Sequence, residues 1–388
     1  MSVTGPAGFV AAATTAGLKP SGKPDLALVV NTGPEFAAAA VFTGNRIKAA
    51  PVLWSQQAVA DGRLRAVVLN SGGANACTGP DGFGDTHRTA ELVAAAVSTD
   101  ADPVGAGDVA VCSTGLIGVR LPMDKISAGI SSVAARLSES GGRDAAEAIM
   151  TTDTRAKQAR YADEGWSIGG MAKGAGMLAP GLATMLVVLT TDAVVDAPTL
   201  DAELREACRT TFDRVDSDGC MSTNDTVVLM SSGASGVRPT THDFAAALHE
   251  TCADLAMQLL RDAEGAAHDI AVEVQHAASE ADAVEVARAV ARSNLFKCAV
   301  FGGDPNWGRV LAALGTTRAD FEPDRIDVSF NGVEVCRDGG IGDDRALVDL
   351  SGREVRLEIN LRNGPHRATV WTNDLTYDYV QENAEYST

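Results

Sequence analysis

The sequence is poor in basic and aromatic residues. It contains 32 Lys and Arg against 51 Asp and Glu, for a formal net charge of −19, and only 5% of its residues are aromatic. Such a chain lacks the positive surface that attracts nucleic acids and anionic membranes, so we expect neither as a partner. The acidic excess is typical of a soluble protein, and an acidic field also attracts cationic amino acids.

Long apolar runs and closely spaced metal ligands are also missing. No stretch reaches the 18 apolar residues of a membrane span, and the first residues, MSVTGPAGFVAAATTAG, have no basic region leading into an apolar core. The seven cysteines show no C-x-x-C spacing, and the six histidines show no H-x-x-x-H or H-E-x-x-H. We therefore expect a cytoplasmic protein with reduced cysteines and no structural metal.

Helix-like and strand-like segments alternate along the 388 residues, which favours an α/β architecture with two subdomains. The segment at residues 297–301, Lys-Cys-Ala-Val-Phe, predicts a buried strand. Strand patterns become denser further on, and Asn331-Gly332 predicts a hairpin turn. We expect an α/β core over residues 1–289 and a smaller C-terminal α+β subdomain over residues 290–388.

The segment Gly169 to Ala193, GGMAKGAGMLAPGLATMLVVLTTDA, joins a glycine-rich stretch to an apolar run. Five glycines and a proline precede Ala183-Thr184, and the run 185–189 follows at once. This order predicts a flexible loop that delivers the Thr184 hydroxyl to the first residue of a buried strand. Thr184 is the candidate nucleophile, and the alternative is a β-forming residue that merely opens a strand.

Polar motifs follow or precede several other predicted elements. After the strand 109–112, Thr114 and Gly115 place a hydroxyl beside a backbone N–H, as an oxyanion site requires, although the motif is also common in turns. Thr151 ends a predicted helix, where it binds a substrate or caps the helix. The turn SGGANACTG lacks both dinucleotide spacing and a Walker lysine, which indicates a structural or substrate-lining loop.

Several segments together resemble the ornithine acetyltransferase family, the bifunctional ArgJ-type enzymes of arginine biosynthesis. They are CSTGLIG, IMTTDT, GGMAKGAGM followed by LATMLVVLTTDA, STNDTV, DAEG, FKCAVFGGDPNWGRVLAALG and the tail YVQENAEYST. They extend over essentially the whole chain. The lysine-glycine segment followed by Ala-Thr-Met-Leu is the most specific of them.

The resemblance implies a precursor that cuts itself between Ala183 and Thr184, giving an α chain of residues 1–183 and a β chain of residues 184–388. It also implies a layered αββα fold and a heterotetramer of two α and two β chains. Thr184 would attack the Ala183 carbonyl in a strained turn. Cleavage would free an α-amine with a reference pKa of about 7.7 to 8.0, which can serve as the base for its own hydroxyl.

The same resemblance implies roles for individual residues. Thr184 is the nucleophile and acetyl carrier, and Thr114 with Gly115 forms the oxyanion hole. Lys173 suits a substrate α-carboxylate, and Glu264 suits the ammonium group of ornithine. The full set of implied substrate contacts is Thr151, Lys173, Thr184, Glu264, Asn383 and Thr388.

The implied reaction is a ping-pong transfer of acetyl from N-acetyl-L-ornithine to L-glutamate through acetyl-Thr184, without a metal or cofactor. Acetyl-CoA, a donor for some family members, stays open as a second donor. Two alternatives are an N-terminal-nucleophile amidohydrolase or aminopeptidase, and an uncleaved, non-enzymatic scaffold. Gly181, Cys220, Met221, Ala267 and His268 depart from the family pattern, which bears on maturation and substrate preference rather than on the reaction class.

Overall fold

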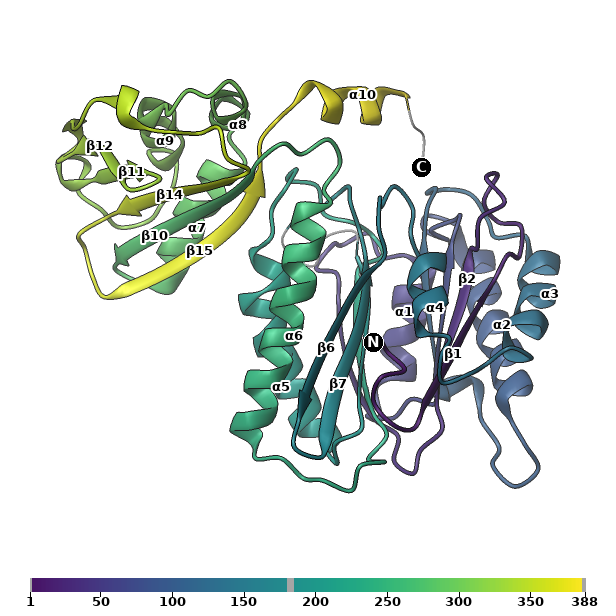
Figure 1. The fold of residues 1–388 in the computed structure, drawn as a ribbon. Coiled ribbons are helices and arrows are strands. Elements are labelled where there is room, and N and C mark those ends of the chain that lie inside the picture. Colours follow the sequence, from purple (N-terminus) through teal and green to yellow (C-terminus); the bar gives the residue numbers. More distant parts are fainter. Residues whose placement is uncertain (1, 180–184, 386–388) are drawn as a thin grey trace.

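The computed structural model describes residues 2–179 and 185–385, and these form a larger N-terminal unit and a smaller C-terminal unit (Figure 1). Two sheets are stacked face to face in the N-terminal unit. The first has the order β1-β2-β4-β5 and consists of β1 (Phe9–Thr14), β2 (Leu26–Asn31), β4 (Ala66–Ser71) and β5 (Val109–Thr114). β4 and β5 are parallel, so their carboxyl ends meet at one edge.

The second sheet has the order β3-β9-β8-β7-β6. Its strands are β3 (Ala37–Phe42), β6 (Lys157–Asp163), β7 (Trp166–Lys173), β8 (Leu186–Thr191) and β9 (Thr226–Ser231). β7 and β8 are antiparallel, with Lys173 opposite Leu186. The end of β7 therefore lies beside the start of β8.

Helices cover the outer faces of the two sheets, while the inner faces pack on each other. Val29 and Leu69 of the first sheet share one core with Val188 and Met230 of the second. The helices of this unit are α1 (Ala50–Ala58), α2 (Gly79–Val97), α3 (Met123–Ala134), α4 (Gly142–Ala148), α5 (Ala197–Thr210) and α6 (Thr241–Arg261). α2 and α3 pack on the first sheet, and α5 and α6 on the second. The predicted layered αββα fold is confirmed.

The C-terminal unit is one sheet with the order β13-β12-β11-β14-β10-β15 and three helices. Its elements are β10 (Asp269–Ala277), α7 (Glu280–Ala291), α8 (Asn294–Phe301), α9 (Trp307–Leu314), β11 (Asp327–Phe330), β12 (Val333–Arg337), β13 (Gly340–Ile341), β14 (Glu354–Asn360) and β15 (His366–Asn373). The boundary expected at residue 290 falls inside this unit, because β10 and α7 share its sheet and core. The unit begins at β10.

The last described helix, α10 (Tyr377–Glu385), leaves β15 and runs back toward the N-terminal unit (Figure 1). Thr376, just before it, donates a hydrogen bond to the Gly265 carbonyl at 2.6 Å. An alanine-like Cβ at Gly265 would lie 2.2 Å from the Tyr379 nitrogen. α10 is therefore in direct contact with the loop that follows α6.

Two local predictions need correction, and one is confirmed. Residues 297–301 belong to helix α8 and not to a strand, because Ser293 caps the helix and Phe296 and Val300 lie on one buried face. Gly169 and Gly170 lie inside strand β7 rather than in a loop. A Cβ at Gly169 would lie 2.2 Å from the Ser2 carbonyl oxygen, so this glycine provides close packing. The hairpin turn at Asn331-Gly332 is confirmed.

Candidate active site

The ends of β5 and β7 bring three of the predicted site residues together. Lys173, at the end of β7, has its side-chain nitrogen buried, and this nitrogen donates to Thr151 Oγ1 at 2.7 Å and to Thr114 Oγ1 at 3.3 Å. Thr114 ends β5, and Thr151 follows α4. The two sheets therefore contribute to one polar cluster.

Gly115 follows Thr114 in a backbone conformation that glycine favours, with φ of 128°. A Cβ at this position would lie 2.6 Å from the Gly73 nitrogen. The amides of Gly72 and Gly73 donate to the Thr114 carbonyl at 2.9 and 3.0 Å. The predicted turn SGGANACTG thus supports the end of β5 through its backbone.

The cluster lies beside the start of β8, which follows residues 180–184. Ala183 and Thr184, the predicted cleavage site and nucleophile, lie outside the described residues, as does Thr388. The amide of Met185, the residue after Thr184, donates to Asp225 Oδ1 at 3.2 Å. Burial raises the pKa of the Asp225 carboxyl well above its usual range, although the Met185 amide opposes this. The segment STNDTV, one of the family motifs, contains Asp225, but sequence reasoning did not single out this residue.

The charge of Lys173 is set by two opposing effects. Burial lowers the pKa of Lys173, and the negative charge of Asp153 raises it. Within the described residues the direct hydrogen-bond partners of its Nζ are hydroxyl groups. A buried cation without a bonded carboxylate is able to bind an anionic ligand group.

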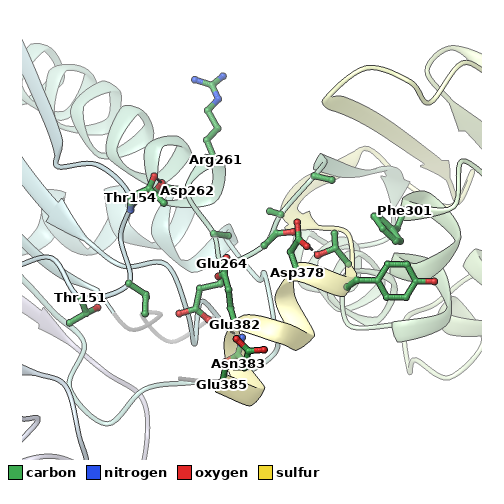
Figure 2. A pocket seen from close by; sticks show the side chains of 17 residues that line it. Thr151, Thr154, Arg261, Asp262, Glu264, Phe301, Asp378, Glu382, Asn383 and Glu385 are labelled. Atoms are coloured by element: carbon green, nitrogen blue, oxygen red, sulfur yellow. Dashed lines mark hydrogen bonds between the residues drawn. The ribbon is translucent and has the colours of Figure 1, made fainter. Parts of the chain in front are cut away.

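A cavity of about 820 Å³ opens between the loop after α6, Thr151 and α10. Figure 2 shows Glu264, Glu382 and Asn383 gathered where α10 meets this loop. Asn383 Nδ2 donates to Glu264 Oε2 at 3.0 Å, and the Glu264 amide donates to the Ala175 carbonyl at 3.0 Å. Thr151 lines the cavity and also contacts Lys173, so it connects the two groups of predicted residues.

Acidic side chains that sequence reasoning did not single out line the same cavity. Asp378 and Glu382 of α10 face it together with Glu264. Partial burial raises the pKa of Glu382, and the charges of Glu264 and Asp378 raise it further. Glu382 lies within the tail YVQENAEYST, directly before Asn383, and this adjacency was the sequence feature that could have indicated it. The cavity wall thus favours a ligand with an ammonium group.

Two of the unusual residues after Glu264 connect the N-terminal unit to the C-terminal sheet. The amides of Ala267 and His268 donate to Asp374 Oδ1 at 3.0 and 2.9 Å. The His268 ring also contacts Asp374 through Nδ1, at 2.7 Å from Oδ2. These contacts hold Ala267 and His268 against the residue that follows β15, and Ala267 also lines the cavity.

Neither metal ligands nor membrane helices are found in the described parts of the chain. Within residues 2–179 and 185–385, no three His, Cys, Asp or Glu side chains are grouped so as to hold a metal ion. No helix in these same ranges combines the length and apolar character needed to cross a membrane. The seven cysteines are free.

The sequence matches the ArgJ family over residues 10–388. The chain belongs to the ArgJ family. It is 63% identical over 387 residues to the arginine biosynthesis bifunctional protein ArgJ of Streptomyces coelicolor, with 100% of both chains covered. It is 61% identical over 388 residues to that of Thermobifida fusca, again over 100% of both chains.

A solved structure of an ArgJ-type enzyme is similar to part of the chain. The structure of ornithine acetyltransferase complexed with ornithine from Mycobacterium tuberculosis is 60% identical and covers 48% of this chain and 96% of its own, with a TM-score of 0.46. The full-length relatives are bifunctional proteins of arginine biosynthesis, so the chain is an ArgJ-type enzyme of that pathway.

Proposed function

We propose that this ArgJ-type enzyme transfers the acetyl group of N-acetyl-L-ornithine to L-glutamate by a ping-pong mechanism through acetyl-Thr184. One observation carries the proposal: Lys173 and two threonine hydroxyl groups converge beside the start of β8, the strand that follows Thr184 in the chain. Acyl transfer needs a nucleophile with groups beside it that bind the substrate and stabilise the oxyanion. The Lys173 ammonium and the threonine hydroxyl groups would serve this purpose beside Thr184.

Self-cleavage would generate the nucleophile. The Thr184 hydroxyl attacks the Ala183 carbonyl, the Ala183–Thr184 C–N bond breaks, and water hydrolyses the resulting ester. The products are an α chain of residues 1–183 and a β chain of residues 184–388. Thr184 is the first residue of the β chain, and its free α-amine can accept the proton of its own hydroxyl. The Asp225 bond to the Met185 amide supports this step, because it holds the residue next to the new terminus.

Acetyl transfer would then take two half-reactions. The Thr184 oxygen attacks the acetyl carbonyl, the acetyl C–N bond breaks, and ornithine leaves with a proton on its nitrogen. The glutamate α-amine then attacks the acetyl ester, the bond to the Thr184 oxygen breaks, and a proton from the amine restores the Thr184 hydroxyl. Thr114 and Gly115 would stabilise the oxyanion, a role worth about 3 to 4 kcal/mol per donor. Lys173 and Thr151 would bind the substrate α-carboxylate, while Glu264, Asn383 and Thr388 would complete the site. Acetyl-CoA is a second donor to be tested.

The acidic cavity supports a diamino acid as one ligand. Glu264 and Glu382 face it, and an ornithine side-chain ammonium would relieve their mutual repulsion. The related enzyme from Mycobacterium tuberculosis is complexed with ornithine, which agrees with this assignment. We further propose a cytoplasmic heterotetramer of two α and two β chains.

The decisive experiment measures acetyl transfer and cleavage on the same preparation. Purified protein should show two fragments on a denaturing gel and should form N-acetylglutamate from N-acetylornithine and glutamate. Thr184→Ala should give one full-length band and no transfer. Transfer activity in that variant would refute the assigned nucleophile.

Two further outcomes separate the alternatives. Release of acetate at an undiminished rate without glutamate would favour an amidohydrolase. A single band that persists on incubation of the wild type would favour an uncleaved scaffold. Replacing N-acetylornithine by acetyl-CoA in the same assay tests the second donor.

A further inference from the structure

A buried ion-pair network lies behind the residues assigned to substrate binding. Lys157 Nζ lies 2.6 Å from Asp153 Oδ1 and 2.5 Å from Asp262 Oδ2. The side chains of Lys157 and Asp153 are fully buried, and that of Asp262 is 4% exposed. Burying three charges is costly, so their mutual bonds must be well formed. None of the three has a role in the reaction proposed above.

Asp153 is the member of the network that contacts the site backbone. Its Oδ1 accepts the Gly174 amide at 2.7 Å, and its Oδ2 accepts the Thr151 amide at 2.9 Å. Gly174 directly follows Lys173, whose Nζ bonds the Thr151 hydroxyl. One carboxylate therefore fixes the backbone on both sides of the Lys173–Thr151 hydrogen bond.

Asp262 ties the network to a different segment. It accepts hydrogen bonds from the amide and the hydroxyl of Thr154, and it precedes Glu264 by two residues. Among the described residues, the amides of Thr151 and Gly174 bond Asp153 and not Asp262. Asp153 and Asp262 thus bond the same lysine, but only Asp153 holds the surroundings of Lys173.

The charges that act on Lys173 come from several elements. Asp153, Glu264 and Asp225 favour its protonated form, while Lys157 and Lys19 disfavour it. Burial is the largest effect and lowers the pKa of Lys173, and Asp153 is the strongest of the charges that oppose it. Lys173 acts on Asp153 in return. Burial opposes ionisation of Asp153, but the charges of Lys173 and Lys157 lower its pKa to about 2.

We propose that Asp153 is a positioning residue, which orients Lys173 and Thr151 and keeps Lys173 protonated so that the site binds the carboxylate of its substrate. The inference rests on the role of Lys173 in the proposed function. It predicts that the neutral Asp153→Asn variant loses carboxylate binding at a lower pH than the wild type, because Lys173 then gives up its proton more easily.

Calorimetric titration of ornithine into the full protein between about pH 6 and pH 9 tests this. In Asp153→Asn, the midpoint of the affinity loss should fall by about one pH unit or more, as expected for removal of a nearby opposite charge. A ligand without the carboxylate, 1,4-diaminobutane, should show no such shift. Equal midpoints for ornithine in the wild type and the variant would overturn the proposal.

Asp262→Asn is the matched control. It also removes one carboxylate from Lys157, but it leaves the amides of Thr151 and Gly174 bonded to Asp153. The pH midpoint at which this variant loses ornithine affinity should equal that of the wild type. The same shift in both variants would mean a general effect of breaking the network, and would count against a specific role of Asp153.

A second variant keeps the test decisive if circular dichroism shows that Asp153→Asn does not fold. Lys157→Gln removes a positive charge that disfavours protonation of Lys173, so its midpoint should move to higher pH. A downward shift or no shift would contradict the proposal. Because the measurement is binding, a wild type that binds ornithine without transferring acetyl would refute the proposed function and leave this test intact.

Discussion

Lys173 Nζ at the end of β7 lies 3.3 Å from Thr114 Oγ1 at the end of β5. The bond crosses from one stacked sheet to the other at the edge where the candidate site lies. The position of Lys173 therefore depends on the packing of both sheets, and each sheet alone would leave this buried ammonium without one of its partners.

Lys173→Met should weaken substrate binding and also lower thermal stability. The loss of a charge-assisted hydrogen bond of about 2 kcal/mol corresponds to a roughly 30-fold rise in KM for both substrates. Tm should fall because Lys173 is the charge that most favours ionisation of the buried Asp153, and the variant removes it. Initial rates and thermal melts of wild type and variant check this, with exposed Lys23→Met as the control. An unchanged KM would remove Lys173 from the binding site.

Gly115→Ala should lower kcat by about 100-fold, because a Cβ would lie 2.6 Å from the Gly73 nitrogen and displace the proposed oxyanion donor. Gly118→Ala is a matched control, since Gly118 also has a positive φ of 83° but no atom within 4 Å of its Cβ position. Single-turnover acetylation measures the effect. Equal losses in the two variants would indicate backbone strain alone.

Gly265→Ala should detach α10 from the loop after α6. The added methyl group would lie 2.2 Å from the Tyr379 nitrogen, so Asn383 would lose its bond to Glu264. We expect roughly a 10-fold rise in KM for N-acetylornithine and faster proteolysis within residues 375–385, consistent with the loss of about 1.4 kcal/mol of binding. Gly236→Ala, with φ of 69° and open space around its Cβ position, should behave like the wild type in both assays.

Acid should remove a contribution of Asp153 to stability. The pKa of Asp153 is about 2 in the folded protein and 3.8 in its unperturbed state, so the contribution is complete above about pH 4 and is lost as pH falls through 2. The difference in unfolding free energy between wild type and Asp153→Asn should shrink by about 2 kcal/mol over this interval. Urea denaturation at several pH values measures it. A difference that stays constant with pH would contradict the lowered pKa.

The α/β class and most of the elements could be predicted because apolar periodicity is a local property of the sequence. The layered αββα arrangement was expected only from the family resemblance. The short run at residues 297–301 was assigned wrongly because its four apolar residues, 298–301, fit a buried helix turn as well as a strand. Gly169 and Gly170 resembled a loop because their close neighbours, Ser2 and Leu255, are distant in the sequence.

The candidate site could be predicted only in part, because some of its contacts join residues that are distant in the sequence. The motifs indicated Thr114, Thr151 and Lys173, and the structure places these three in one hydrogen-bonded cluster. The link from Lys157 to Asp262 spans 105 residues and depends on the fold, so no local pattern could indicate it. The preferences of residue types likewise do not predict that Asp225 bonds the amide of Met185 at the start of β8.

The contact between α10 and Gly265 also has a consequence for the order in which the enzyme is made. Both stacked sheets of the N-terminal unit and the C-terminal sheet precede α10 in the chain, and so they leave the ribosome before it does. A nascent chain can therefore bury its cores while the cavity still lacks the wall that carries Asn383. We expect the site to close only after α10 has been synthesised, which keeps an incomplete chain from binding substrate in the complete arrangement.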